Sequence, residues 1–127
     1  MYKNLSGVLA MSVPSRKDKP LPDLIPFKYR KNFCHTDEQC RLIITVENRG
    51  AAAAPPSTTR VEFEEGRYVD IPTPVIPPFS IVDLDPVEIS FPESGVTLFT
   101  IIVNARHEIR ESTLENNAAD GLCSKSI

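Results

Sequence analysis

The chain has 127 residues, of which 41% are hydrophobic and 24% charged, so it can form one domain with one core and is neither wholly disordered nor a coiled coil. Its 14 basic and 17 acidic residues give a net charge of -3 without a continuous positive run, which argues against a nucleic-acid partner. No apolar stretch approaches the roughly 20 residues that cross a bilayer, so we expect no membrane insertion.

The first 20 residues show no sustained hydrophobic period and end in a charged patch. This predicts a flexible N-terminal tail or linker at 1–20, followed by a domain at 21–127. The apolar run from Leu5 to Val13 follows Lys3, as in a secretion signal. However, a glycine and two serines interrupt the run, and no small-residue cleavage site follows it, so we interpret it as part of the tail.

Alternation of apolar and polar residues predicts a series of half-buried β-strands. In residues 58–64, Val61 and Phe63 point to one face and charged side chains point to the other, as expected when one face of a sheet is buried. Pro26, in the first segment, is tolerated only at the edge of a sheet. In chain order, the predicted strands are 23–29, 41–47, 58–64, a short strand at 68–71, 80–90, 96–104 and 118–124.

Proline-rich and polar segments separate these strands. Four alanines followed by two prolines predict a loop at 51–56, and residues 72–79 are expected to cross between sheets. Pro86 interrupts the strand at 80–90, and the polar segment 107–117 predicts a structured hairpin loop. The predicted core consists of Leu42, Ile44, Val46, Val61, Phe63, Val82, Leu84, Phe99, Ile101 and Val103.

Seven short strands separated by turn residues are typical of two packed sheets. We therefore predict an all-β, immunoglobulin-like seven-stranded antiparallel β-sandwich. In such a fold the first strand can pair in parallel with the last. That pairing would bring the end of the last strand near the loop that follows the first.

The sequence contains three cysteines, Cys34, Cys40 and Cys123, and the predicted fold brings Cys123 near the other two. A Cys34–Cys123 bridge would remove about 4 to 5 kcal/mol of unfolded-chain entropy, against about 2 to 2.5 kcal/mol for a Cys34–Cys40 bridge. We favour the Cys34–Cys123 disulfide with Cys40 free, and a Cys40–Cys123 bridge is the alternative. Reduced thiols, or a zinc site at Cys34, His35, Cys40 and Cys123, are further alternatives, although the spacing lacks Cys-x-x-Cys pairs.

The sequence offers no catalytic constellation, and we predict that the protein is not an enzyme. The histidines, His35 and His107, each lie in a polar loop, and no motif of a serine hydrolase, a zinc protease or a phosphate-binding loop occurs. Solvated strand faces routinely produce close carboxylate pairs such as Glu64 with Glu65 and Asp83 with Asp85.

The richest polar group lies in and just before the predicted loop at 107–117. Oxygen ligands in a loop at the end of a sandwich can hold calcium. The calcium candidates are Glu108, Glu111, Glu115 and Asn117, with Asn104, His107 and Asn116 beside them. Alternatively, Glu111 and Asn117 tie the loop to its own backbone through side-chain hydrogen bonds. We favour no metal site and expect no cofactor.

Five motifs in a fixed order support a resemblance to a known family. They are Asp23-Leu24-Ile25-Pro26, Val46-Glu47-Asn48-Arg49-Gly50, Ser57-Thr58-Thr59-Arg60-Val61-Glu62-Phe63, Ile76-Pro77-Pro78-Phe79-Ser80, and Ile109-Arg110-Glu111-Ser112 before Asn116-Asn117. Over residues 22–123 the chain resembles the CARDB family, the cell-adhesion-related domain of bacteria. The resemblance implies a seven-stranded immunoglobulin-like sandwich that is usually one module of a secreted or surface protein and has no general catalytic activity.

The chain departs from that family's pattern at three positions. Asn104 and Leu114 stand where such domains often carry an acidic residue, so each change removes a carboxylate from a place where calcium could bind. Phe79 replaces the usual glycine before the strand at 80–90, which we expect to alter that turn without changing the fold.

We predict a noncatalytic module of an extracellular or cell-surface prokaryotic protein, which acts as a spacer or as an adhesion or protein-binding domain. Its partners would be an unknown protein or glycan and the neighbouring domains of a larger protein. Contacts are expected at the loops 50–57 and 105–117, or at a sheet edge and the crossover 71–79. The alternative is a calcium- or zinc-binding regulatory domain, or a carbohydrate-binding domain, against which the absence of tryptophan argues.

Overall fold

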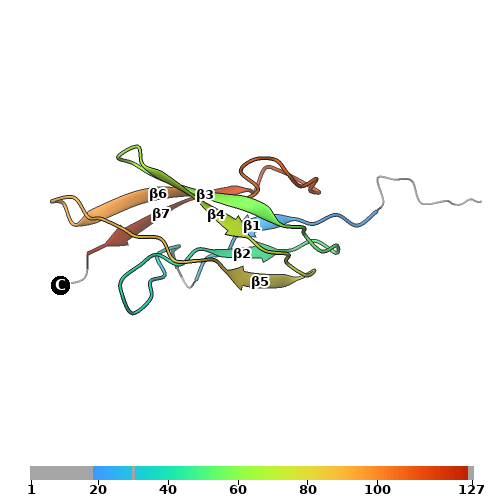
Figure 1. Cartoon of the computed structure of the whole chain (residues 1–127), viewed down its shortest axis with the longest axis horizontal. Helices are drawn as coiled ribbons and strands as arrows, with labels where there is room; N and C mark the ends of the chain where they lie inside the picture. Colours follow the sequence, from blue (N-terminus) through green and yellow to red (C-terminus); the bar gives the residue numbers. More distant parts are fainter. Residues whose placement is uncertain (1–18, 30, 126–127) are drawn as a thin grey trace, which may run out of the picture.

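The computed structural model describes residues 19–29 and 31–125, which form two β-sheets packed face to face (Figure 1). The strands are β1 (Leu24–Pro26), β2 (Thr45–Asn48), β3 (Ser57–Phe63), β4 (Tyr68–Thr73), β5 (Ser80–Asp83), β6 (Val96–Ile102) and β7 (Ala118–Ser124). One sheet has the order β1-β2-β5 and the other has the order β4-β3-β6-β7. All the strand pairs are antiparallel, so the predicted all-β, seven-stranded sandwich is confirmed.

The core between the sheets consists of side chains that alternate with outward-facing ones along each strand. Val61 and Phe63 of β3 are buried, while the residue between them is exposed. They lie opposite Ile101 and Phe99 of β6, which are buried in the same way. Nine of the ten predicted core residues are buried, and the tenth, Val82, is half-buried and packs against the others.

Four strands, β1, β2, β5 and β6, are shorter than the sequence predicts. The segment 41–47 joins the ladder only at Thr45, and β5 ends at Asp83 rather than continuing to residue 90. Beyond these strands the pairing survives as one isolated bridge between Leu42 and Val87, each of which donates its N–H to the other's carbonyl at 2.8 Å.

The reason is a bulge at Pro86. The hydrogen bond from Leu84 N–H to the Ile44 carbonyl is followed by the Leu42–Val87 bridge. The segment after β5 therefore advances three residues, from 84 to 87, while the segment before β2 advances only two, from 44 to 42. Proline has no N–H to give to the ladder, which suits it to the extra position. The interruption predicted at Pro86 is therefore a bulge, after which the strand resumes for one residue only.

The predicted parallel pairing of the first strand with the last is wrong. Among the described residues β1 pairs with β2 alone. β1 ends at Pro26, and the N–H of Leu24 is taken by the side chain of Glu111 instead of by the backbone of β7. β1 and β7 nevertheless lie in contact. They form a seam between the two sheets, the β1–β7 seam, that backbone hydrogen bonds do not close.

The described chain begins and ends at opposite ends of the sandwich (Figure 1). The segments 19–23, 49–56, 74–79 and 103–117 form the N-terminal end, and the segments 27–44, 64–67 and 84–95 form the C-terminal end with Lys125. In this part of the chain no helix is long and apolar enough to span a membrane. The tail predicted at 1–20 lies outside the described residues as far as residue 18, and so do residues 126–127.

Candidate functional site

The N-terminal end is organised by Asn48, the last residue of β2, whose side chain is fully buried. Its Oδ1 accepts hydrogen bonds from the N–H groups of Asp23 at 3.0 Å and Gly50 at 2.9 Å. Its Nδ2 donates to the carbonyls of Ala52 at 2.8 Å and Ile76 at 3.1 Å. One buried amide thus fixes the positions of the start of β1, the turn after β2 and the crossover that leads to β5.

Gly50 allows this close approach. A Cβ at this position would lie 2.2 Å from the carbonyl oxygen of Leu21, so any side chain would push the start of the domain away from the turn. On the other side of the turn, Ala54 and Ile76 exchange backbone hydrogen bonds of 2.9 and 3.0 Å. The Asn-x-Gly motif therefore joins distant segments in addition to forming the turn after β2.

Glu111 has the same role in the long loop between β6 and β7. It is 9% exposed, and its Oε1 accepts the N–H of Leu24 at 2.6 Å. Its Oε2 accepts the Nδ2 groups of Asn104 at 2.8 Å and Asn117 at 2.7 Å. N–H donors therefore occupy both oxygens, which stabilises a buried carboxylate. Because Leu24 and Glu111 are 87 positions apart, this contact holds the loop against β1 across the seam.

Asn104 explains one departure from the family pattern. It is buried with a left-handed φ of 50°, a conformation that asparagine tolerates better than most residues. Its Oδ1 accepts the N–H of Ile109 at 3.1 Å, and its Nδ2 donates to the Ile109 carbonyl at 2.8 Å as well as to Glu111. An aspartate could not donate these bonds and would face Glu111 with a second negative charge.

The crossover between β4 and β5 presents apolar side chains on a stiff backbone. Three exposed prolines restrict residues 74–79, and Ile76 is fully buried as their anchor. Val75 and Phe79 point outward with 54% and 73% of their surface exposed. Phe79 also has a φ of 57°, which is unfavourable for a bulky residue, and this is the position where the family resemblance leads one to expect glycine.

We expect Phe79→Gly to raise the free energy of unfolding by about 0.5 to 1 kcal/mol. Left-handed geometry costs a side chain roughly 1 to 2 kcal/mol, and the greater freedom of glycine in the unfolded chain offsets about half of that gain. Urea denaturation measures the change. Phe79→Ala is the matched control, because it removes the ring but keeps the Cβ and its strain. Equal stability of the two variants would show that the backbone strain has no cost.

The calcium candidates do not converge on one site. Glu108 and Glu115 are exposed, whereas Glu111 and Asn117 are buried and hydrogen-bonded to each other. Within residues 19–29 and 31–125 no group of three or more His, Cys, Asp or Glu side chains could hold a metal ion. The geometry corresponds to the alternative in which side-chain hydrogen bonds tie the loop down, and Glu111 also ties it to β1.

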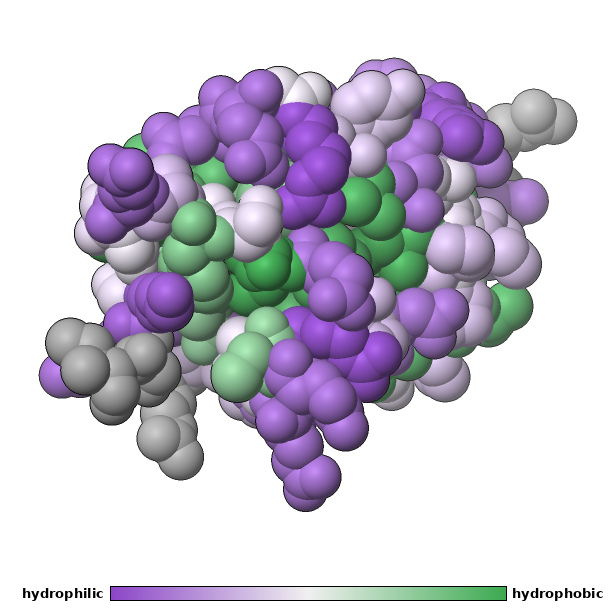
Figure 2. Space-filling view, turned by 60° about the vertical axis from the view of Figure 1, so that its left-hand side comes forward, coloured by the Kyte–Doolittle hydropathy of each residue, from purple (hydrophilic) through white to green (hydrophobic). Residues whose placement is uncertain are grey.

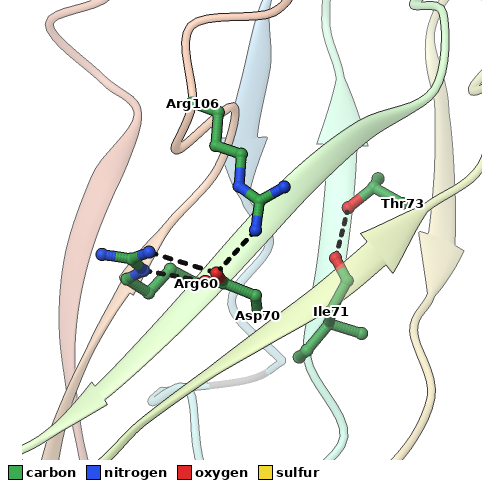
Figure 3. Close-up of polar contacts among 5 residues, drawn as sticks. All are labelled: Arg60, Asp70, Ile71, Thr73 and Arg106. Atoms are coloured by element: carbon green, nitrogen blue, oxygen red, sulfur yellow. Dashed lines mark hydrogen bonds and ion pairs between the residues drawn. The ribbon is translucent and has the colours of Figure 1, made fainter.

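The outer face of β3 and β4 carries a charged cluster (Figure 3). Asp70 accepts hydrogen bonds from Arg60 at 2.7 and 3.1 Å and from Arg106, in the β6–β7 loop, at 3.1 Å. The Arg60 guanidinium also lies 4.2 Å from the ring centre of Tyr68. The hydrogen bond from Arg60 holds the pKa of Asp70 below its ordinary value; partial burial opposes this shift and Arg106 adds to it.

A pH titration tests this cluster. Because the pKa of Asp70 is lower in the folded state, its contribution to stability is complete above the unfolded pKa and is lost as the pH falls through the folded pKa. We expect Asp70→Asn to be slightly less stable than the wild type at pH 6 to 7, and the difference to disappear as the pH falls through the lowered folded-state pKa of Asp70. Asp85→Asn, an exposed control, should show no such convergence. A gap between wild type and Asp70→Asn that persists in acid would contradict the assignment.

Exposed apolar side chains are scattered over several elements instead of lining one deep cleft. Figure 2 shows hydrophobic surface in a shallow recess across the middle of one face, with hydrophilic side chains above and below it. Leu98 and Leu122 lie opposite each other on β6 and β7. Tyr68 is stacked with Arg60, so its ring is already partly engaged. Among the residues that the structure describes, the large exposed apolar side chains are those of Tyr68, Val75, Phe79, Ile81, Leu98, Leu114 and Leu122.

The C-terminal end contains the cysteines. A disulfide joins Cys34 to Cys123, the pairing favoured from the sequence, and Cys40 is an exposed free thiol. The zinc alternative does not fit this arrangement, because two of its sulfurs are bonded to each other. His35 instead stacks on Tyr29 with ring centres 4.2 Å apart. The bridge forms without the expected strand pairing because the segment after β1 itself runs to the end of β7.

The carboxylate pairs have ordinary surface partners. Glu65 forms an ion pair with Arg67 at 3.2 Å, and Asp83 accepts a hydrogen bond from the hydroxyl of Thr45 in the neighbouring strand. Glu64 and Asp85 are exposed, as is His107. The role of Asn48 in joining distant segments and the role of Asn104 within its own loop were not predicted from the sequence; the Asn-x-Gly spacing after a strand was the available signal for the first.

The fold matches solved structures, although no family profile and no curated protein matches the sequence. The CARDB domain of the PF1109 protein of Pyrococcus furiosus, solved in complex with di-metal ions, has a TM-score of 0.56 and 16% identity, over 83% of this chain and 94% of that one. A domain of a predicted cell surface protein of Methanosarcina acetivorans has a TM-score of 0.60 and 16% identity, over 84% of this chain and 93% of that one. The structure thus confirms, at the level of the fold, the resemblance to the CARDB domain.

Proposed function

We propose that this domain is a noncatalytic immunoglobulin-like module of a surface or secreted prokaryotic protein, which serves as a spacer or as an adhesion or protein-binding domain. The observation that carries the proposal is the placement of the described chain ends at opposite ends of the sandwich (Figure 1). Domains joined before and after this one would lie in series along its long axis. A rigid sandwich is suited to that arrangement.

The location outside the cell or at its surface is supported by two observations. The Cys34–Cys123 disulfide is a bond that persists in oxidising compartments and is rare in the cytosol. The archaeal domain with the higher TM-score of the two belongs to a predicted cell surface protein. Likeness of fold alone does not fix function, so adhesion is a proposal about this chain.

A binding partner would contact the N-terminal end. The loops 50–57 and 105–117, where contacts were expected, lie there beside the crossover 74–79. Asn48 and Glu111 hold these loops in place, so a partner would not have to order them on binding. The crossover adds the exposed side chains of Val75 and Phe79.

The proposal is tested by screening the immobilised domain against surface glycans and surface proteins, with two variants beside the wild type. Phe79→Asp changes the N-terminal end, and Glu93→Lys changes an exposed turn at the other end. Adhesion predicts a partner that Phe79→Asp weakens at least about tenfold, a change of 1.4 kcal/mol, and Glu93→Lys does not. A screen without any binder would remove the adhesion role and leave the spacer role.

The calcium alternative makes a different prediction. The Oδ1 atoms of Asn116 and Asn117 accept no hydrogen bond from the described residues, but the oxygens of Glu111 are occupied and the other candidate carboxylates face solvent. We therefore expect millimolar calcium to leave the melting temperature unchanged, as measured by differential scanning fluorimetry with magnesium as the control. A rise with calcium alone would show that the folded domain binds the ion and would contradict this expectation.

A further inference from the structure

All three cysteine residues line one cavity at the C-terminal end. The cavity has a volume of about 410 Å³ and is lined by both halves of the disulfide, Cys34 and Cys123, and by the free thiol residue Cys40. Ile89 and Phe91 form its apolar wall. A free thiol and a disulfide that border the same small space are the two reactants of thiol–disulfide exchange.

We propose that this cavity is an exchange site, in which Cys40 replaces Cys34 as the covalent partner of Cys123. The Cys40 thiol gives its proton to solvent, and the thiolate sulfur forms a bond with the Sγ of Cys123. The bond between Cys34 and Cys123 breaks, and its electron pair leaves with the Sγ of Cys34, which takes up a proton. One thiol and one disulfide are present before and after, so the step needs no oxidant or reductant.

Chain entropy scarcely distinguishes the two bridges. The Cys34–Cys123 bridge spans 89 positions, and Cys40 lies only six residues further along the chain. The entropy of loop closure depends on the logarithm of the loop length, so both bridges restrict the unfolded chain almost equally. A Cys34–Cys40 bridge would close only a short ring and stabilise far less. The local geometry therefore decides which partner Cys123 keeps.

That geometry is strained at Cys40. Its φ is 59°, in the left-handed region that few residues other than glycine favour. The turn around it is held by Asp37, whose carboxylate accepts the N–H of Arg41 at 2.8 Å and the Nε of Arg41 at 2.8 Å. Exchange would draw this turn toward the end of β7 and release Cys40 from its present conformation.

The turn is the element that would move, and most of its residues are exposed. It lies between Thr36 and Leu42, which are joined by an isolated bridge. The charged residues that line the cavity are Glu88 and Lys125, and the turn contributes only the uncharged Thr36, Gln39 and Cys40. After exchange, β7 would be bonded to the turn through Cys40 instead of to the preceding segment through Cys34. The surface of the C-terminal end would therefore change.

The experiment is disulfide mapping of the folded wild-type protein. The protein is equilibrated at pH 8 in a mixture of reduced and oxidised glutathione, quenched with acid, and labelled at free thiols with N-ethylmaleimide. Cys34 and Cys40 both lie between Lys31 and Arg41, with Glu38 between them, so a protease that cleaves after glutamate separates them for mass spectrometry.

The proposal predicts that the label shifts from Cys40 alone to Cys40 in some molecules and Cys34 in others. The matched control, Cys40→Ser, should carry no label, because its single pair of cysteines stays joined. Label on Cys40 alone in the equilibrated wild type would overturn the proposal.

A second variant removes the preferred partner. If Cys40 can reach Cys123, these two cysteines of Cys34→Ser form a disulfide in the same glutathione mixture. Neither cysteine then takes the label. If both cysteines of this variant take the label, they cannot reach each other in the folded domain, and the proposal is wrong.

Discussion

Replacing Glu111 by alanine is expected to lower the free energy of unfolding by about 3 to 5 kcal/mol. The substitution leaves three buried N–H donors without an acceptor, one on Leu24 and one each on Asn104 and Asn117. Each donor then carries the cost of its lost hydration, which is larger for bonds to a charged group than for neutral ones. Urea denaturation at pH 7 measures the loss.

The controls come from the same loop. Glu108→Ala and Glu115→Ala remove carboxylates of the same kind that are exposed, and each should change stability by no more than about 0.5 kcal/mol. Glu111→Gln keeps one carbonyl oxygen and should fall between these controls and Glu111→Ala. Equal effects at all three glutamates would mean that the Glu111 network contributes nothing beyond surface charge.

A related variant tests whether Asn104 is needed for its amide group or only for its size and shape. Asn104→Asp preserves size and the tolerance of left-handed φ, but it places a second carboxylate against Glu111 and removes the donor to the Ile109 carbonyl. We expect this variant to be destabilised at pH 7 and to recover in acid, where protonation removes the repulsion. Denaturation at pH 4 and 7 distinguishes this from a loss of packing, which would be independent of pH.

Features that depend on local sequence were predicted correctly. The last strand, residues 118–124, has the predicted bounds, and Val61 with Phe63 and Phe99 with Ile101 lie on the predicted faces. Alternation is read within one segment, because burial of one face imposes it on every strand. Strand ends were less well predicted, because the bulge at Pro86 depends on what lies opposite it.

The parts that were missed depend on partners far away in the sequence. Asn48 joins residues 25 positions before it and 28 positions after it, and Glu111 reaches Leu24 over 87 positions. No local pattern specifies such pairs. The sequence did indicate that Glu111 could bond to its own loop instead of binding a metal ion. It did not indicate that Glu111 would accept the N–H of Leu24, or that no backbone hydrogen bonds would join β1 to β7.

One main link therefore closes the β1–β7 seam at each end of the sandwich, and at the N-terminal end hydrogen bonds from Asn116 to Asp23 and from Ser112 to Pro22 lie beside it. Glu111 links the β6–β7 loop to β1 at the N-terminal end, and the disulfide links the segment after β1 to β7 at the C-terminal end. They share no residue. We infer that the covalent link has the larger effect, because it also restricts the unfolded chain.

Removing the disulfide is expected to lower the free energy of unfolding by about 4 to 5 kcal/mol, the chain-entropy value for a loop of 89 positions. The change is best made in a background without the free thiol, by comparing Cys34→Ser/Cys40→Ser with Cys40→Ser alone. The single variant keeps the bridge and should match the wild type within about 0.5 kcal/mol. In the double variant neither Cys34 nor Cys40 can pair with Cys123, so the measured difference belongs to the link itself.

Combining this double variant with Glu111→Ala tests whether the two links act independently. Links at opposite ends of a seam, with no shared partner, should have additive effects within about 0.5 kcal/mol. Their sum would approach the total stability of a small domain, about 5 to 15 kcal/mol, so the combined variant is expected to be largely unfolded in water. A combined loss clearly smaller than the sum would show that opening one end of the seam already releases the other. β1 would then detach as a unit, and the β1–β7 seam would be the first part of the sandwich to open.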